Sequence, residues 1–400
     1  MARRAWGEGS YDYRELTDSW RWRGYYNDAS GAKKRKEIVS KSRKVLKAKV
    51  KMFLEEMENN HTDVLSNMTV EKWSQIWLND VIKTTVKVRT YENYKCSCNN
   101  HIIPNFGKEK LNKLQSLRIQ QYLNQLCNSH ATNTVITIRN HFIIMLNSAV
   151  EHGYIKTNVA KRTKPPRRDK ASTTALTDEQ IKKLLEVVED GAYIFYGAKQ
   201  IWKENEGMIY LRHCYYAAVL LALTSGMRMG EIFGLRWENV NLEQNLVKVI
   251  NNMVTSSEKG EFLDVPKTAT SKRNILLPQK TVKVLKYWRE FQSKYAEKWK
   301  GIFENKKDLV FTNSFGKFVS TSNFNSRYFR KMLKASGLDD CICFHSLRHS
   351  HATQLLKNGV NVKIVSERLG HSSTSVTMDI YAHALPDMQE GAVQELNKIY

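Results

Sequence analysis

The run "RHCYYAAVLLALTSG", residues 212–226, constrains the fold of this 400-residue chain more than any other stretch. Every residue from Cys214 to Leu223 is apolar or aromatic, so a helix here has no polar face and is predicted to be buried on all sides. A chain with 42% hydrophobic residues can build a domain that surrounds such a helix. The run is shorter than the roughly eighteen apolar residues that suggest a membrane span, so we expect no membrane partner.

The buried helix is predicted to end at Ser225–Gly226, and a charged residue follows at once. Arg228 stands at the start of the next helical segment, "MGEIFGL". Glu231, three residues later, is spaced to orient Arg228 through a charge-assisted hydrogen bond. Pairs of this kind are common on helix surfaces, so the pair alone does not separate a functional arginine from an exposed one.

The stretch "FHSLRHSHATQLL", residues 344–356, combines polar and apolar residues on one predicted helix face. His345, Arg348 and His349 share that face, and Ala352 continues it one turn later. Burying these groups without partners is costly, so an anion is expected to meet them near the helix N-terminus. A satisfied core histidine beside a surface arginine is the alternative. A metal on His345 and His349 lacks a third ligand, and no metal is predicted.

The charge of the chain points to a polyanionic partner. The chain has 63 Lys and Arg against 40 Asp and Glu, a net charge of +23, and much of the excess is concentrated in residues 33–51. Nucleic acid is the commonest partner of so basic a protein. The six cysteines have no C-x-x-C spacing, and the first residues have no apolar signal core. We therefore expect reduced thiols and a cytoplasmic protein.

The pattern along the chain predicts a multidomain fold. Residues 1–60 alternate aromatic and charged residues before a basic helix, which predicts a small α+β domain with a three-stranded sheet. Residues 68–161 predict an all-α domain of four helices, and residues 162–175 form a basic, proline-containing linker. Residues 176–400 predict a mainly α domain with a small antiparallel β-sheet. Residues 190–207 look like an insertion to which no chemistry is assigned.

Two local predictions accompany this division. The stretch "ENNHTDVLSN", residues 58–67, is predicted to be a linker. The small sheet is predicted to have three strands, in "NLVKVINNMV", "GEFLDVP" and "KRNILLP". The N-terminal helix is predicted to use Val45 and Val50 on its buried face.

Five segments between Thr224 and Ala384 resemble, in their order, the catalytic domain of the tyrosine recombinases, the phage-integrase family. They are "TSGMRMGEIFGLRW", "PKTATSKRNILLP", "FHSLRHSHATQLL", "RLGHSS" and "TMDIYAHA". Where this family most often has Thr-Gly before the first arginine, this chain has Ser225–Gly226. The helical region before them resembles the core-binding domain, and the basic N-terminus resembles the arm-binding domain of integrases from phages and conjugative transposons.

The resemblance implies a chemistry for the matching residues. Tyr381 would attack a scissile phosphodiester and form a 3′-phosphotyrosyl link. Arg228 and Arg348 would bind the non-bridging oxygens, because arginine stays charged and binds two oxygens at once. The remaining residues implied are His345 and His371 on the phosphate, Lys267 as the acid for the leaving 5′ oxygen, Glu231 behind Arg228, and His349 as a structural residue. No cofactor is implied.

The resemblance also implies partners. We expect double-stranded DNA with core and arm sites, a homotetramer on that DNA, and an accessory directionality factor. The C-terminal tail would pack on the neighbouring subunit. The residues predicted to contact DNA are Arg21, Arg23, Lys33, Lys34, Arg35, Arg162, Lys164, Arg167 and Arg168.

Two other functions remain open from the sequence. A type IB topoisomerase shares the chemistry but acts alone, and the arm-like N-terminus and the tail favour a recombinase over it. A non-enzymatic DNA-binding regulator would also be basic and helical, but it has no reason to bring Arg228, Arg348 and Tyr381 together. We therefore predict a site-specific recombinase of a bacterial mobile element, closer to a conjugative transposon than to a phage.

Overall fold

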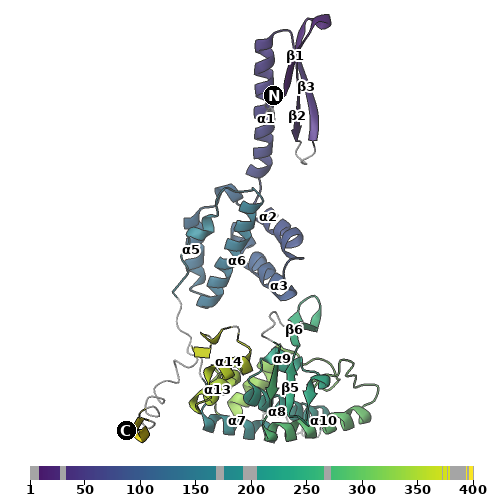
Figure 1. The fold of residues 1–400 in the computed structure, drawn as a ribbon, viewed down its shortest axis with the longest axis vertical. Helices are drawn as coiled ribbons and strands as arrows, with labels where there is room; N and C mark the ends of the chain where they lie inside the picture. Colours follow the sequence, from purple (N-terminus) through teal and green to yellow (C-terminus); the bar gives the residue numbers. More distant parts are fainter. Residues whose placement is uncertain are drawn as a thin grey trace. The chain divides into compact units, whose positions relative to one another are not determined.

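A computed structural model of the chain describes residues 9–27, 33–167, 175–191, 205–264, 272–371, 373–375, 377–378, 393 and 396–399. The chain divides into two compact units, Met1–Lys170 and Ala171–Tyr400 (Figure 1). The helices described include none with the length and apolar content that a membrane span requires.

The first unit begins with a three-stranded antiparallel sheet followed by a long helix. The sheet has the order β1-β2-β3, and helix α1 packs against β2 and β3 (Figure 1). A small core of Trp22, Leu46 and Val50 joins the helix to the sheet. The elements are β1 (Ser10–Arg14), a 3-10 turn (Glu15–Thr17), β2 (Ser19–Asn27), β3 (Lys33–Ser40) and α1 (Arg43–Ser66).

Two details of α1 differ from the sequence predictions. The helix continues to Ser66, through most of the stretch predicted as a linker. The polar residues there favour a loop, but no proline or glycine interrupts the sequence. The prediction was right for Val50, which is buried, and wrong for Val45, which is exposed; Leu46 takes its place on the buried face.

The rest of the first unit is helical and has a second, separate core. Trp73, Trp77, Phe106 and Phe142 are among its fully buried side chains. Thr69 caps the first helix, accepting a hydrogen bond from the backbone N–H of Lys72 at 3.3 Å, as predicted. The elements are α2 (Val70–Ile76), π-helical turns (Trp77–Ile82 and Cys98–Ile102), α3 (Val88–Ser97), α4 (Ile103–Phe106), a 3-10 turn (Leu111–Lys113), α5 (Ser116–Leu126), α6 (Thr132–Glu151) and a 3-10 turn (Val159–Arg162).

The second unit is built around the apolar helix that the sequence singled out. This helix, α8 (Glu206–Ser225), contacts α7, α10 and α13, and its residues from Cys214 to Leu223 are all buried (Figure 1). The other helical elements are α7 (Asp178–Asp190), α9 (Met229–Phe233), a 3-10 turn (Trp237–Asn239), α10 (Gln279–Lys298), α11 (Thr321–Asn323), a π-helical turn (Phe324–Phe329), α12 (Arg330–Ala335), α13 (Phe344–Lys357) and α14 (Val362–Leu369).

The strands of the second unit differ from the predicted three-stranded sheet. The segment predicted to be the first strand forms two strands, β5 and β6. They are separate because β5 pairs with β8 whereas β6 pairs with β7. The result is a three-stranded sheet in the order β4-β5-β8 and a separate hairpin, β6-β7. The strands are β4 (Val240–Asn241), β5 (Leu246–Val249), β6 (Asn252–Ser256), β7 (Gly260–Asp264) and β8 (Arg273–Leu276). The multidomain fold with a small antiparallel sheet is confirmed, whereas the predicted domain boundaries remain predictions.

Candidate active site

The turn after α8 needs a glycine. Gly226 ends the helix in the left-handed region, with φ of 66°, and its N–H donates to Ala222 O at 3.0 Å. A Cβ at this position would lie 2.6 Å from Cδ2 of His351 and 2.7 Å from Cδ2 of Leu369. The tight turn therefore packs against the middle of α13 and the end of α14, and Arg228 two residues later donates to Gly370 O at that same helix end.

Arg228 is held by Glu231, as the sequence predicted. Its Nη1 donates to Oε1 at 2.9 Å, and its backbone N–H donates to Oε2 at 2.8 Å. The Glu231 side chain is 3% exposed, whereas that of Arg228 is 38% exposed. Burial raises the pKa of Glu231, but the bonds and charges of Arg273 and Arg228 outweigh burial and lower it. Glu231 is therefore a fixed anion behind an accessible arginine.

Arg348 lies on α13 and is 3% exposed. Its Nη1 donates to Gly226 O and its Nη2 to Leu369 O, both at 2.7 Å. Within the described ranges no carboxylate forms an ion pair with it, and burial together with the charge of Arg228 lowers its pKa to about 9. The guanidinium is still charged at neutral pH, so the site holds positive charge that an anion would offset.

His345 and His349 lie together on the exposed edge of α13. Their rings are 4.8 Å apart and nearly perpendicular. Burial, then His349 and the two arginines, lowers the pKa of His345 to about 4, and burial and Arg348 lower that of His349. Both imidazoles are therefore neutral at pH 7 in the free protein and can donate one proton and accept another.

His371 reaches the same place from a different segment. It follows Gly370, which ends α14 with φ of 68°. Its Nδ1 lies 2.8 Å from Oγ1 of Thr377. Burial, then the charges of Arg348 and Arg228, lowers the pKa of His371 to about 4. The structure thus brings together four of the six predicted catalytic residues: Arg228, His345, Arg348 and His371.

Three consecutive carbonyls at the end of α14 bind three arginines. Arg368 O accepts from Arg273 at 2.7 Å, Leu369 O from Arg348 at 2.7 Å, and Gly370 O from Arg228 at 3.4 Å. The C-terminus of a helix carries partial negative charge, which stabilises nearby cations. The sequence prediction missed Arg273, although it lies inside the quoted segment "PKTATSKRNILLP".

His351 is a second residue whose role the sequence did not show. It is buried, with Nδ1 at 2.8 Å from Leu223 O and Nε2 at 3.1 Å from Nε of Arg368. Leu347, which does not share the face of His345 and Arg348, is also fully buried. Helix α13 has packed neighbours on more than one side, which a helical wheel does not reveal.

Several predicted residues lie outside the described ranges. These are the nucleophile Tyr381, the acid Lys267, the linker residue Arg168 and most of the insertion at residues 190–207. Their predicted roles remain predictions.

The predicted DNA contacts of the N-terminal sheet divide between its two faces. Arg21, Arg23 and Arg35 alternate with the helix-facing residues, so they lie on the face away from α1, whereas Lys34 lies on the face that carries Trp22. The side chain of Lys33 lies outside the described residues. Arg21 forms a short ion pair with Asp12, and Arg23 lies 3.6 Å from the same carboxyl group. Arg21 and Arg23 of this open face are therefore paired with a carboxylate.

The predicted contacts of the linker are exposed. Arg162, Lys164 and Arg167 all face solvent. Lys164 is fixed by its backbone, because its N–H donates to Oε1 of Gln120 at 2.7 Å and its carbonyl accepts from Nε2 at 3.3 Å. The start of the linker is thus ordered, with its basic side chains free to extend.

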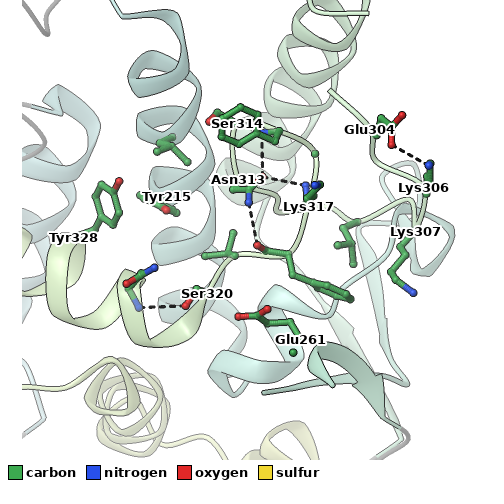
Figure 2. Close-up of a pocket in the computed structure, with 18 of the residues that line it drawn as sticks. Tyr215, Glu261, Glu304, Lys306, Lys307, Asn313, Ser314, Lys317, Ser320 and Tyr328 are labelled. Atoms are coloured by element: carbon green, nitrogen blue, oxygen red, sulfur yellow. Dashed lines mark hydrogen bonds and ion pairs between the residues drawn. The ribbon is translucent and has the colours of Figure 1, made fainter. Parts of the chain in front are cut away.

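A pocket of about 910 Å³ lies elsewhere in the second unit (Figure 2). Asn313 organises one wall, its side chain bonded to Phe315 and Lys317, and Tyr215 and Tyr328 lie at another. The described residues that line it include none of the predicted catalytic residues. The cluster of arginines and histidines therefore lies outside this pocket, and in it His345 is exposed and Arg228 is partly exposed, whereas Arg348 is buried.

The arrangement suits reactions at phosphorus. Negative charge develops on the non-bridging oxygens during attack on a phosphodiester, and fixed guanidinium groups stabilise it without reorganising. Among the described residues, no group of three or more His, Cys, Asp and Glu side chains has the arrangement of a metal site. The described positive charges at this site belong to side chains. Arg228 is accessible, whereas Arg348 is buried.

Comparison with known proteins identifies the class of enzyme to which this fold belongs. Residues 174–388 match the Phage integrase family, and residues 69–127 match the Phage integrase, N-terminal SAM-like domain. Since the first match spans more than half of the chain, the chain belongs to the phage integrase family, the tyrosine recombinases.

Similar proteins extend this match over nearly the whole length. The tyrosine recombinase XerC-like protein of Caldanaerobacter subterraneus subsp. tengcongensis is 29% identical over 392 residues, which cover 93% of this chain and 94% of that protein. The Tn1549 transposon integrase, solved with transposon right end DNA, superposes with a TM-score of 0.63 at 18% identity, over 82% of this chain and 100% of that one. The lambda integrase tetramer on a Holliday junction gives 0.55 at 18% identity, over 95% and 96%.

These matches confirm the resemblance predicted from the sequence. The chain is a tyrosine recombinase, an enzyme of DNA recombination and integration, and its fold is that of multidomain integrases. Neither the type IB topoisomerase nor the non-enzymatic regulator is favoured.

Proposed function

We propose that the chain is the integrase of a bacterial mobile element, of the conjugative-transposon kind, and that it cuts and rejoins DNA at specific core and arm sites. The observation that carries the proposal is the convergence of Arg228, Arg348, His345 and His371, which come from three separate segments. Arg348 is buried without a carboxylate partner among the described residues, which is costly unless an anion binds. A DNA phosphate is an anion that reaches the accessible Arg228.

In the proposed reaction Tyr381 is the nucleophile. Its oxygen forms a bond to phosphorus, the bond from phosphorus to O5′ breaks, and Lys267 gives the leaving oxygen a proton. A phenol has a pKa of about 10, so the cations at the site are needed to favour the attacking phenolate. The covalent 3′-phosphotyrosyl link keeps the bond energy, and attack by a 5′-hydroxyl of another strand reverses the step.

The other residues stabilise the phosphate and move protons. Arg228 and Arg348 bind the non-bridging oxygens, where charge increases in the transition state. His345 and His371 are neutral at pH 7, so either can accept the tyrosine proton while donating to the phosphate. Glu231 keeps Arg228 in place, and His349 supports His345.

DNA binding is proposed for two basic surfaces. The open face of the N-terminal sheet, with Arg21, Arg23 and Arg35, contacts arm sites together with Lys33, and Lys34 contacts phosphate at the edge. A sheet can enter the major groove, where arginine distinguishes guanine from other bases. The linker residues Arg162, Lys164, Arg167 and Arg168 follow the backbone next to the core site.

The proposed active assembly is a homotetramer on DNA, coupled by the C-terminal tail. Val393, Leu396 and Ile399 of the tail are 54%, 52% and 74% exposed, at spacings that put them on one helix face. An exposed apolar stripe is stabilised when a neighbouring subunit covers it. The lambda integrase solved on a Holliday junction is a tetramer. A directionality factor and a location on DNA in the bacterial cytoplasm complete the proposal.

A covalent trapping experiment tests the nucleophile. The purified chain is incubated with a library of nicked duplexes randomised on both sides of the nick, so that the short 5′-hydroxyl fragment is lost after cleavage. After boiling in detergent, wild-type protein should remain attached to DNA, and Tyr381→Phe should not. Absence of any wild-type adduct, or an equal adduct in Tyr381→Phe, contradicts the proposal. Sequencing the attached DNA identifies the core site, which then serves as substrate in every later experiment.

A further inference from the structure

Arg273 is a buried arginine that no sequence motif assigned to the site. It is the first residue of β8, and its side chain is 6% exposed. Its Nη1 and Nη2 donate to the two carboxylate oxygens of Glu231, at 3.1 and 2.8 Å. A two-bond fork fixes the orientation of a carboxylate as well as its position. Arg273 therefore determines how Glu231 is presented to its other partner.

That other partner is Arg228, which binds the same two oxygens. Oε1 accepts from Nη1 of Arg228, and Oε2 accepts from its backbone N–H. Each oxygen of Glu231 thus accepts one bond from Arg228 and one from Arg273. The side chains of Arg273 and Glu231 are buried, at 6% and 3% exposure, whereas that of Arg228 is 38% exposed. The two inner residues hold the outer guanidinium at the surface.

Arg273 also anchors the end of α14. Its Nε donates to Arg368 O at 2.7 Å, and the next two carbonyls of the helix accept from Arg348 and Arg228. The Arg273 side chain lies against Gly370, where an added Cβ would meet its Cδ and Nη1 at 3.1 Å. Both arginines proposed to bind phosphate therefore donate hydrogen bonds to a helix end that Arg273 also binds.

We infer that Arg273 is a positioning residue for strand transfer. It fixes the position of the Arg228 side chain through Glu231, and it fixes the position of the Arg348 side chain through the end of α14. The inference rests on the proposed function, since it concerns the same phosphate. The Arg273 side chain is 6% exposed, and its Nε, Nη1 and Nη2 each donate to a protein acceptor, so we assign it a role in positioning other residues and not in contacting DNA.

Two substitutions separate the effect of the two-bond contact with Glu231 from the effect of the positive charge. Arg273→Met keeps volume but removes all three bonds, and Arg273→Lys keeps a charge without the fork. We expect the initial rate of adduct formation to fall roughly 10–100-fold in Arg273→Met, the loss typical of a residue that orients an active group, with partial recovery in Arg273→Lys. Arg330→Met is the matched control and should keep the wild-type rate, because Arg330 is exposed and pairs only with Asp340 in the described contacts.

A neutral phosphate analogue separates positioning from general damage. A methylphosphonate at the scissile position replaces a charged non-bridging oxygen with a methyl group, so it removes charge that Arg228 and Arg348 would stabilise. If Arg273 acts through them, the defect of Arg273→Met should be about tenfold smaller on methylphosphonate DNA than on phosphodiester DNA. A structural defect lowers both rates equally.

The outcomes are distinct. An equal defect on both DNAs, or no defect, overturns the inference. Should Arg273→Met not fold, Arg273→Met with Glu231→Gln removes the buried charge that has lost its Arg273 partner, and this double variant should still show the substrate-dependent defect. Absence of any adduct with wild-type protein instead contradicts the proposed function itself.

Discussion

Arg368 donates a hydrogen bond from Nε to Nε2 of His351 at 3.1 Å, which places the imidazole proton on Nδ1. Nδ1 then donates to Leu223 O at 2.8 Å. Both ring nitrogens are therefore hydrogen-bonded, and the ring is buried. Burial together with the charge of Arg368 lowers the pKa of His351 to about 4. The neutral ring joins the middle of α13 to the C-terminal ends of α8 and α14.

His351 should make the second unit sensitive to mild acid. Between pH 6.5 and 4 the unfolded chain binds a proton at this residue that the folded chain excludes, so stabilisation present above pH 6.5 is lost as the pH falls toward 4. The contribution is at most about 3 kcal/mol. Urea unfolding of wild type and His351→Phe at pH 8 and pH 5 measures it. The variant should be less stable at pH 8 and should lose less stability on acidification; an equal acid loss in both proteins would assign the sensitivity to other groups.

Gly226→Ala should disturb both stability and cleavage. Its φ of 66° costs an alanine about 1–2 kcal/mol, and the new Cβ would also press on His351 and Leu369. Gly359→Ala is the matched control, because Gly359 has φ of 73° but nothing within 4 Å of an added Cβ. Thermal unfolding should show the larger loss at Gly226. Only that variant should also slow adduct formation, since Gly226 O binds Arg348; equal effects at the two glycines would exclude the packing argument.

Arg348→Lys should inactivate the enzyme although it keeps the charge. The guanidinium bridges Gly226 O and Leu369 O, 2.7 Å from each, and a single ammonium group cannot do this while facing a phosphate. Loss of one fixed donor to a developing oxyanion typically costs about 10²–10³-fold. Initial adduct rates should show this loss, with DNA affinity changed little. A lysine variant with near wild-type rate would show that charge alone is sufficient.

The motif residues could be predicted because their geometry is local. The spacing of Arg228 and Glu231 and the break at Gly226 each depend on one turn of backbone, and the structure confirms both. The apolar run of α8 needed only its composition.

The partners across the fold could not be predicted in this way. Arg273 lies 42 residues from Glu231 in sequence, and His351 lies 17 from Arg368. Helical periodicity gives the face that a residue occupies but not the element that packs against it. The split between β5 and β6 has the same cause, because each strand is defined by its pairing partner rather than by its own residues.

Deleting residues 387–400 should separate single-strand cleavage from ordered exchange. The exposed Val393, Leu396 and Ile399 are proposed to be covered in a neighbouring subunit, and no predicted catalytic residue is removed. The shortened chain should still form an adduct on nicked DNA. Light scattering on full-length core DNA should show loss of the tetramer, and recombination products should decrease. Intact assembly together with intact ordered exchange would contradict the role of the tail.

The end of α14 constrains the site through its backbone. Its contacts to Arg273, Arg348 and Arg228 are made by backbone carbonyls, which every amino acid possesses, so these three contacts do not depend on side-chain identity. The side chains of Arg368 and Leu369 are constrained separately, by the bond to His351 and by burial in the core. The three carbonyl contacts do depend on the length of the helix. One inserted residue would rotate the last carbonyls by about 100° and shift them by about 1.5 Å, which would misalign all three arginines at once. We therefore expect the sequences of related enzymes to differ by substitutions in α14 and never by insertions or deletions within it.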